Sequence, residues 1–356
     1  MIRALIFLFF AWQSPSPEVL QHLQAGADAE KTGHFDAAIV EFQKVTELAP
    51  AAATGFARLG QAYLEKGDYG GAIRPLQQAV KLDPDMAAAH QLLGYALLSQ
   101  GYPVQAIPHL EKSDDVAALG IAQLEAGQLT DAVAHLQTAL AKRPNDPDLL
   151  YYLGRASGLL SKQSIDTLIA AYPDSARSHQ AMAENYYVLR QMPQAEKEFQ
   201  EAIRLRPDLP KIHLELGLVY AGASQWPQAE GAFRAETKLQ PGDAEAAYRL
   251  GNALLQQGKA KEARAELSRS DKLLPDMPET LYALGKAAAL EGDAASAEKA
   301  WTKVIQLEKG SSLAGQAHFA LAGSYRKQGR STDAEREMEE FNKLQAKPVS
   351  PEGPQR

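Results

Sequence analysis

The side chains that could do chemistry in this sequence are eight histidines and many scattered carboxylates. Imidazole can bind a metal ion or move a proton, so the spacing of the histidines is the first test of function. Six of them recur at two fixed places in a repeated pattern, with His90, His179, His213 and His318 at one place and His109 and His135 at the other. The ligands of one metal ion must converge in space rather than recur along a chain. We therefore predict that these histidines are structural and that the protein has no metal site.

The sequence motifs of enzymes and cofactor sites are missing. There is no phosphate-binding GxxxxGK[ST] loop, no HExxH zinc motif and no GxSxG nucleophile turn. Because the chain has no cysteine, it has no thiolate nucleophile, no Cys-based zinc site and no disulfide. Carboxylates such as those in AEREMEEF are typical of a solvated helix face rather than of a pair placed for acid–base work. The sequence predicts a protein that is not an enzyme and binds no cofactor.

Charge argues against nucleic acid as a partner. The 356 residues carry a formal net charge of −7, and no long basic run is present. Phosphate contacts need clustered Lys and Arg, so we expect no nucleic-acid binding. Proteins and peptides remain as the expected partners.

Small residues recur with a fixed spacing between residues 19 and 348, and this spacing indicates the elements of the fold. In a regular 34-residue repeat, Gly stands at positions 8 and 15, Ala at 20 and Pro at 32, as Gly60, Gly67, Ala72 and Pro84 illustrate. Gly at 8 and Ala at 20 let two helices approach closely, and a large apolar residue at position 24 fills the space between them. Gly at 15 ends the first helix in a left-handed conformation, and Pro at 32 stops the second. Each repeat is therefore predicted to be a pair of helices.

The pattern resembles the tetratricopeptide repeat, and the resemblance covers nearly the whole chain. Position 7 is leucine in most of the ten repeats that we number from residue 19, including Leu59, Leu93, Leu119, Leu153, Leu216, Leu250 and Leu284. The resemblance implies an all-α fold, a right-handed α-solenoid of about ten helix-turn-helix repeats.

Three repeats break the period: residues 87–112, 147–175 and 278–314. The first two are short, so their second helices should be clipped, whereas the third has additional residues that we expect to form a flexible loop at 310–312. Asp114 and Asp115 follow the first of them and are expected to cap the next helix. We expect irregular stacking near residues 100–175, either as neutral variation or as a change in the curvature of the solenoid. The tail at 349–356 is rich in proline and should be disordered.

In the family that the pattern resembles, first helices line a concave groove through positions 2, 5, 9, 12 and 13. The resemblance implies that the partner-binding residues here are Tyr151, Arg155, Glu184, Tyr187, Lys211, Tyr248, Asn252, Tyr282, Lys286, Phe319 and Arg326. Tyrosine and arginine often carry the binding energy of interfaces. The alternative is that these aromatic rings pack on their own neighbouring helices. Repeats two to four offer a blander set of residues, such as Gln61 and Gln91.

The amino terminus, MIRALIFLFFAWQSPSP, resembles a secretory signal peptide. Arg3 precedes an apolar run from Ala4 to Trp12, which is too short to span a bilayer but fits a signal core. We predict a signal peptide at 1–18, cleaved between residues 12 and 19, and an exported protein in the periplasm or outside the cell. Without cleavage, the segment would be an interfacial anchor or an ordinary terminus, and the protein would be cytoplasmic.

Together, these features predict a binding scaffold that holds a protein or peptide segment in its groove. One alternative is a component of an envelope-assembly or polysaccharide-export machinery, as exported proteins of the resembling family often are. Another is a regulatory subunit of an enzyme, which the missing catalytic motifs disfavour. The sequence leaves the oligomeric state open.

Overall fold

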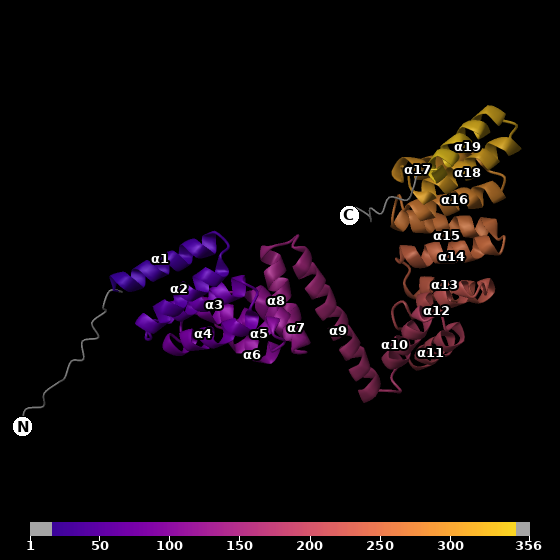
Figure 1. Ribbon diagram of the computed structural model, residues 1–356. Coiled ribbons are helices and arrows are strands. Elements are labelled where there is room, and N and C mark those ends of the chain that lie inside the picture. The colour runs from indigo at the N-terminus through magenta and orange to yellow at the C-terminus, as the bar shows by residue number, and fades with distance from the viewer. Residues whose placement is uncertain (1–15, 347–356) are drawn as a thin grey trace, which may run out of the picture. The chain divides into compact units, whose positions relative to one another are not determined.

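Nineteen helices and no strand form residues 16–346, the part of the chain that the computed structural model describes (Figure 1). Each helix packs on the helices that precede and follow it in most of the chain, which confirms the predicted α-solenoid. The chain divides into two compact bodies between Ser164 and Ile165. Most of the predicted signal peptide, at 1–15, and the predicted tail at 349–356 lie outside the described residues.

The amino-terminal body contains four helix pairs and the first part of a longer helix. Its pairs are α1 (Pro17–Lys31) with α2 (Phe35–Leu48), α3 (Ala53–Glu65) with α4 (Tyr69–Leu82), α5 (Ala87–Ser99) with α6 (Pro103–Leu110), and α7 (Val116–Glu125) with α8 (Leu129–Lys142). Helix α9 (Pro147–Ala171) follows and contains the boundary between the two bodies.

The carboxyl-terminal body contains the remaining part of α9 and five helix pairs. The pairs are α10 (Ala176–Val188) with α11 (Met192–Leu205), α12 (Ile212–Gly222) with α13 (Trp226–Leu239), α14 (Ala244–Gln256) with α15 (Ala260–Leu273), α16 (Pro278–Leu290) with α17 (Ala294–Leu307), and α18 (Ser312–Lys327) with α19 (Ser331–Ala346).

Within a pair, the glycine at position 8 is the point of closest approach. A Cβ atom added to Gly60 would lie 2.4 Å from Cγ of Leu76, the residue at position 24 of the same repeat. At Gly251, the same addition would lie 2.5 Å from Cγ of Leu267. Gly67, at position 15, has a φ of 84°, which glycine adopts at little cost and which ends the first helix. The roles that the sequence assigned to these two glycine positions are therefore confirmed.

Between repeats, the seam is made by position 27 of one repeat and position 3 of the next. A Cβ added to Gly55 would lie 2.9 Å from Val45 Cγ1, and Ser270 Oγ lies 3.3 Å from Thr280 Oγ1. The position-3 side chains Ser178, Ile212, Ala246, Thr280 and Ala317 are all 0% exposed. Each complete seam is thus a small dry core that joins one repeat to the next.

Repeat five differs from the prediction, because its two expected helices form one continuous helix. Helix α9 runs for 25 residues without a break. Position 15 of this repeat is Ser161, not a glycine, and no proline occurs between Pro147 and Pro173, so nothing in the local sequence ends the helix. The described residues therefore hold nine helix pairs and one long helix rather than ten pairs.

The other two irregular repeats, three and nine, differ from the regular repeats in the length of one helix and of one loop. Helix α6 of repeat three has eight residues, whereas seven other second helices, from α2 to α17, have 14 each. In repeat nine, the expected loop at 310–312 is shorter than predicted, because Ser311 caps α18 and Ser312 is its first residue.

Candidate functional site

The predicted groove residues of the amino-terminal body lie on the surface of α9. Tyr151 is 60% exposed, and its ring meets that of Tyr152 edge-on at 5.4 Å. The Arg155 guanidinium lies 5.8 Å from the centre of the Tyr151 ring and 3.2 Å from a carboxylate oxygen of Glu125. Both side chains are accessible to a partner, although Arg155 already has two neighbours.

Glu184, Tyr187 and Lys211 stand at the start of the carboxyl-terminal body. Glu184 is exposed and Tyr187 is half-buried on α10, while Lys211 precedes α12 with a left-handed φ of 66°. Burial, followed by the charge of Glu184, raises the pKa of the nearby Glu215 to about 7. This stretch is therefore acidic, and one of its carboxyls is partly protonated at neutral pH.

Three aromatic residues of the predicted groove, Tyr248, Tyr282 and Phe319, differ in exposure. Tyr248 and Tyr282 are half-buried against the core, and burial raises the pKa of the Tyr282 hydroxyl. Phe319 is 54% exposed, with its ring 5.4 Å from that of Phe341. Among residues 16–346, no ring contact joins the three to one another. Two of these rings therefore pack mostly on neighbouring helices and the third is exposed, and their role in binding stays a prediction.

The remaining predicted residues are polar and near these rings in sequence. Asn252 is half-buried and lines a cavity of about 290 Å³ with Leu218 and Trp226. Lys286 on α16 and Arg326 on α18 are exposed. They offer positive charge along the first helices of repeats nine and ten.

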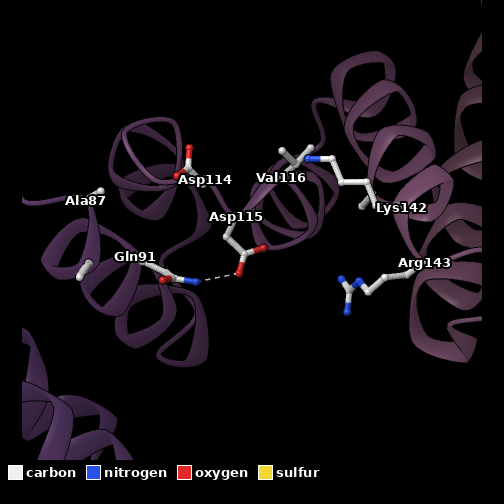
Figure 2. A pocket seen from close by; sticks show the side chains of 9 residues that line it. Ala87, Gln91, Asp114, Asp115, Val116, Lys142 and Arg143 are labelled. Carbon is white, nitrogen blue, oxygen red and sulfur yellow. Dashed lines mark hydrogen bonds between the residues drawn. The ribbon is translucent and has the colours of Figure 1, made fainter.

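A second candidate site, which the sequence did not predict, is a hollow between repeats three and four (Figure 2). Its volume is about 430 Å³, and it lies between the amino-terminal ends of α5 and α7 and the carboxyl-terminal end of α8. We call it the repeat-three hollow and define it by Ala87, Gln91, Asp114, Asp115, Lys142 and Arg143. Repeat three ends at position 26, so the residues from position 27 onward that would occupy this place are missing.

The acidic wall of the hollow is held by hydrogen bonds to Asp115. Its Oδ1 accepts from the Ala118 amide at 2.9 Å, which caps α7, and its Oδ2 accepts from Gln91 Nε2 at 3.0 Å and from the Tyr95 hydroxyl. Burial raises the pKa of this carboxyl, but the three hydrogen bonds together hold it below its usual value. Asp115 is therefore an ionised group at a seam position that is buried and uncharged in most other repeats. The neighbouring Asp114, which was expected to share the cap, does not take part in it.

The basic wall faces it from the end of α8. Arg143 donates to Asp146 at 2.9 Å and stays 56% exposed. Figure 2 shows Asp114 and Asp115 on one side of the hollow and Lys142 and Arg143 on the other. Within the described part of the chain, neither Lys142 nor Asp114 has a side-chain hydrogen bond or an ion pair. Each wall thus contains one charged group with a side-chain partner, Asp115 or Arg143, and one without, Asp114 or Lys142.

Four of the five histidines at position 4 join the two helices of their own repeats. His22, His179 and His318 each contact a glutamate at position 23, through Nδ1, at 2.6, 2.6 and 2.7 Å. In repeat three, position 23 is itself a histidine, and the rings of His90 and His109 stack at 5.1 Å. No cluster of three or more possible metal ligands occurs in the residues that the structure describes. The pairing with position 23 accounts for every histidine at position 4 except His213, whose Nε2 lies 3.1 Å from the Pro207 carbonyl oxygen.

Sequence reasoning missed the hollow because it is formed by absent residues. The 26-residue length of repeat three was visible, as was the acidic pair that follows it. What the sequence did not reveal was that the side chains of Gln91 and Asp115, 24 residues apart, would form a hydrogen bond across the gap.

No helix within residues 16–346 is long and apolar enough to cross a membrane.

Family profiles match most of the repeats. The profile described as "Tetratricopeptide repeat" matches residues 23–77, 214–278 and 279–346, which together exceed half of the chain. A second profile, described as "TPR repeat", matches 60–101 and 120–158. The stretches left unmatched include the end of repeat three and the second half of α9.

Several solved structures are similar in fold. A fragment of MamA from Desulfovibrio magneticus RS-1 is 20% identical over 50% of this chain and 98% of its own, with a TM-score of 0.47. YrrB, described as a TPR protein with an unusual peptide-binding site, is 18% identical over 51% of this chain and 92% of its own, with a TM-score of 0.46. Yeast Tom70 is 14% identical over 92% of both chains, with a TM-score of 0.40. These are likenesses of fold alone, and no curated protein matches the chain by sequence.

Proposed function

This chain belongs to the tetratricopeptide repeat family, and from that membership we propose that it is a scaffold that binds a protein or peptide segment along its first helices. The scaffold acts by binding rather than by catalysis. The observation that carries this proposal is Phe319, a large apolar ring that is 54% exposed on a first helix. An exposed aromatic side chain on a first helix is a suitable interface anchor.

The partner contacts the carboxyl-terminal repeats of the groove. Lys286 and Arg326 are exposed on α16 and α18, the helices that hold Tyr282 and Phe319. Aromatic area combined with positive charge suits a segment with apolar and acidic side chains. The half-buried Tyr248 and Tyr282 contribute an edge of the ring and a hydroxyl rather than a whole anchor.

The test is a cross-linking pull-down from the native host with Phe319→Ala and Lys286→Ala variants. Because truncating a buried anchor typically costs about 2 kcal/mol or more, Phe319→Ala should reduce capture of the main partner by tenfold or more. Gln61→Ala, on the first helix of repeat two, is the matched control and should capture as the wild type does. Equal capture by all variants, with equal helical content, would show that the groove residues have been placed wrongly.

We also propose that the protein is exported after removal of the amino-terminal leader. The apolar run after Arg3 supports this proposal, and so does the start of α1 at Pro17, capped by the Ser16 side chain. Cleavage between residues 12 and 16 would leave α1 intact, whereas cleavage at 18 would remove its first residues. An exported scaffold of this kind would serve envelope assembly or polysaccharide export.

Amino-terminal sequencing of the protein made in its native host tests the proposal of export. A mature protein that begins between residues 13 and 17 is expected. An intact Met1 on protein recovered from the cytoplasm would contradict it.

A further inference from the structure

The repeat-three hollow occupies a place that other repeats fill with their own backbone and side chains. Position 27 is 0% exposed at Ala79 and Ala202 and 1% exposed at Val45, whereas repeat three has no residue at this position. The three helix ends that would pack around it are nevertheless present and ordered. A volume of about 430 Å³ lies within the range of roughly 300–1,000 Å³ that small-ligand sites have.

The two walls carry opposite charges that do not satisfy one another. Asp114 and Lys142 have no side-chain partner among residues 16–346, and no ion pair joins either aspartate to Lys142 or Arg143. A simple anion held by Lys142 would lie opposite two carboxylates, and a simple cation held by Asp114 would lie opposite two basic groups. A ligand that carries both charges avoids each of these repulsions.

Small apolar side chains also line the hollow. Ala87 and Ala139 have only a methyl group, so an aliphatic chain can lie on them, and Val116 separates Asp114 from Lys142 in Figure 2. Lysine and arginine have such a chain between their α-carbon and their charged end, and they commonly lay it along apolar surface.

We propose that the repeat-three hollow binds an α-carboxylate joined to a cationic side chain, as in lysine or arginine that is free or stands at the carboxyl end of a peptide. The carboxylate lies against Lys142 and Arg143, and the side-chain cation lies against Asp114 and Asp115. Asp115 is already fixed by Gln91, Tyr95 and the α7 cap, so it is preorganised for a cation. This site is separate from the groove of the carboxyl-terminal repeats and does not rest on it.

The test uses short synthetic probes and isothermal titration calorimetry on the folded chain. Acetyl-Gly-Gly-Arg with a free carboxylate should bind saturably below about 1 mM. The same peptide with a carboxyl-terminal amide lacks the negative charge, and acetyl-Gly-Gly-Leu lacks the positive charge, so each should bind at least tenfold more weakly. Free L-arginine as a fourth probe tells an amino-acid site from a peptide-terminus site, since only an amino-acid site binds it as tightly as the peptide.

Two variants assign the charges to the walls. Lys142→Ala should abolish the preference for the carboxylate over the amide and keep the preference for Arg over Leu, while Asp114→Asn should do the reverse. Lys81→Ala, which removes an exposed lysine from the last turn of α4, is the matched control and should bind every probe as the wild type does. Phe319→Ala should also bind normally, which separates this site from the groove.

The proposal is overturned if neither L-arginine nor the free-carboxylate peptide binds the folded wild type saturably up to about 10 mM. It is also overturned if both preferences persist in Lys142→Ala and Asp114→Asn. A merely structural role for these exposed residues would leave the preferences unchanged.

Discussion

At the scale of single residues, the glycine at position 8 shows how one atom can decide the packing of a repeat. Gly251 has no room for a side chain, because Leu267 lies in its place and the Ala263 carbonyl oxygen would be 3.3 Å from an added Cβ. Gly154 stands at the same position in repeat five and has nothing within 4 Å of an added Cβ. Replacing the glycine should therefore destabilise the fold at Gly251 and stabilise it at Gly154.

Gly251→Leu should lower the free energy of unfolding by about 1–3 kcal/mol, because the new side chain overpacks the crossing of α14 and α15. Gly154→Leu should raise it by about 0.5–1 kcal/mol, because leucine stabilises a helix interior relative to glycine. Urea unfolding followed by circular dichroism measures both. A neutral result at Gly251 would mean that the register of the repeats is wrong.

Glu215 predicts a dependence of stability on pH. Its pKa is raised to about 7 from the usual 4.5, so the folded chain holds this proton more tightly than the unfolded chain. Stability contributed by this group is present below pH 4.5 and is lost as the pH rises to about 7. Glu215→Gln keeps an oxygen that accepts the hydrogen bond from Gln180. Because glutamine does not ionise, the variant should not lose this stability as the pH rises.

The variant should therefore match the wild type at pH 4.5 and be more stable at pH 8. The difference at pH 8 should be about 1–2 kcal/mol, allowing for partial exposure of the carboxyl. Chemical unfolding at the two pH values measures it. A variant that is less stable than the wild type at pH 8 would contradict the raised pKa.

At the scale of elements, the two halves of α9 differ in burial. Leu149 and Ala156 are buried against α8, whereas every residue from 157 to 171 is exposed or half-buried. The second half of the helix thus has no fully buried side chain, and low burial favours frequent local opening.

Hydrogen exchange should show this difference directly. Amides in 157–171 should exchange at least tenfold faster than those of α14, which is buried along one face and packed on both sides. The helix α8 serves as a control from the amino-terminal body. Equal protection of 157–171 and α14 would contradict the prediction.

The same element shows where sequence reasoning succeeds and where it stops. Repeats with Gly at position 15 were predicted correctly as helix pairs, because a left-handed residue such as Gly67 ends a helix wherever it occurs. Repeat five lacks that glycine and also lacks the proline that begins the second helices of repeats six and seven, so the family resemblance supplied a turn that the local sequence does not encode. In the groove, residue types alone could not separate the exposed Phe319 from the half-buried Tyr282, because exposure depends on the neighbouring helices. The repeat-three hollow was not predicted for a similar reason, since it depends on the absence of residues from position 27 onward in repeat three.

At the scale of the whole molecule, the two bodies have separate cores. The seams between repeats are short-range, so the energy of each body comes from neighbours within it. A chain of this kind need not unfold in one step, and its stability is then not a single number.

Calorimetry should resolve two unfolding transitions. Gly60→Leu, at the crossing of α3 and α4, should lower the temperature of one transition, and Gly251→Leu should lower that of the other. The pair of variants assigns each transition to a body without cutting the chain. If both variants shift one common transition by the same amount, the bodies unfold together.

The low burial of residues 157–171 in α9 also has a mechanical consequence. Under tension applied along the chain, a helix segment with no fully buried side chain should yield ahead of the packed repeats. Its fifteen residues from 157 to 171 would lengthen from about 1.5 Å to about 3.4 Å each, an extension of about 28 Å. The repeats on both sides would stay folded while this segment stretched and recoiled. When force is applied to the two ends of the protein, this segment of α9 should therefore extend reversibly before either body unfolds.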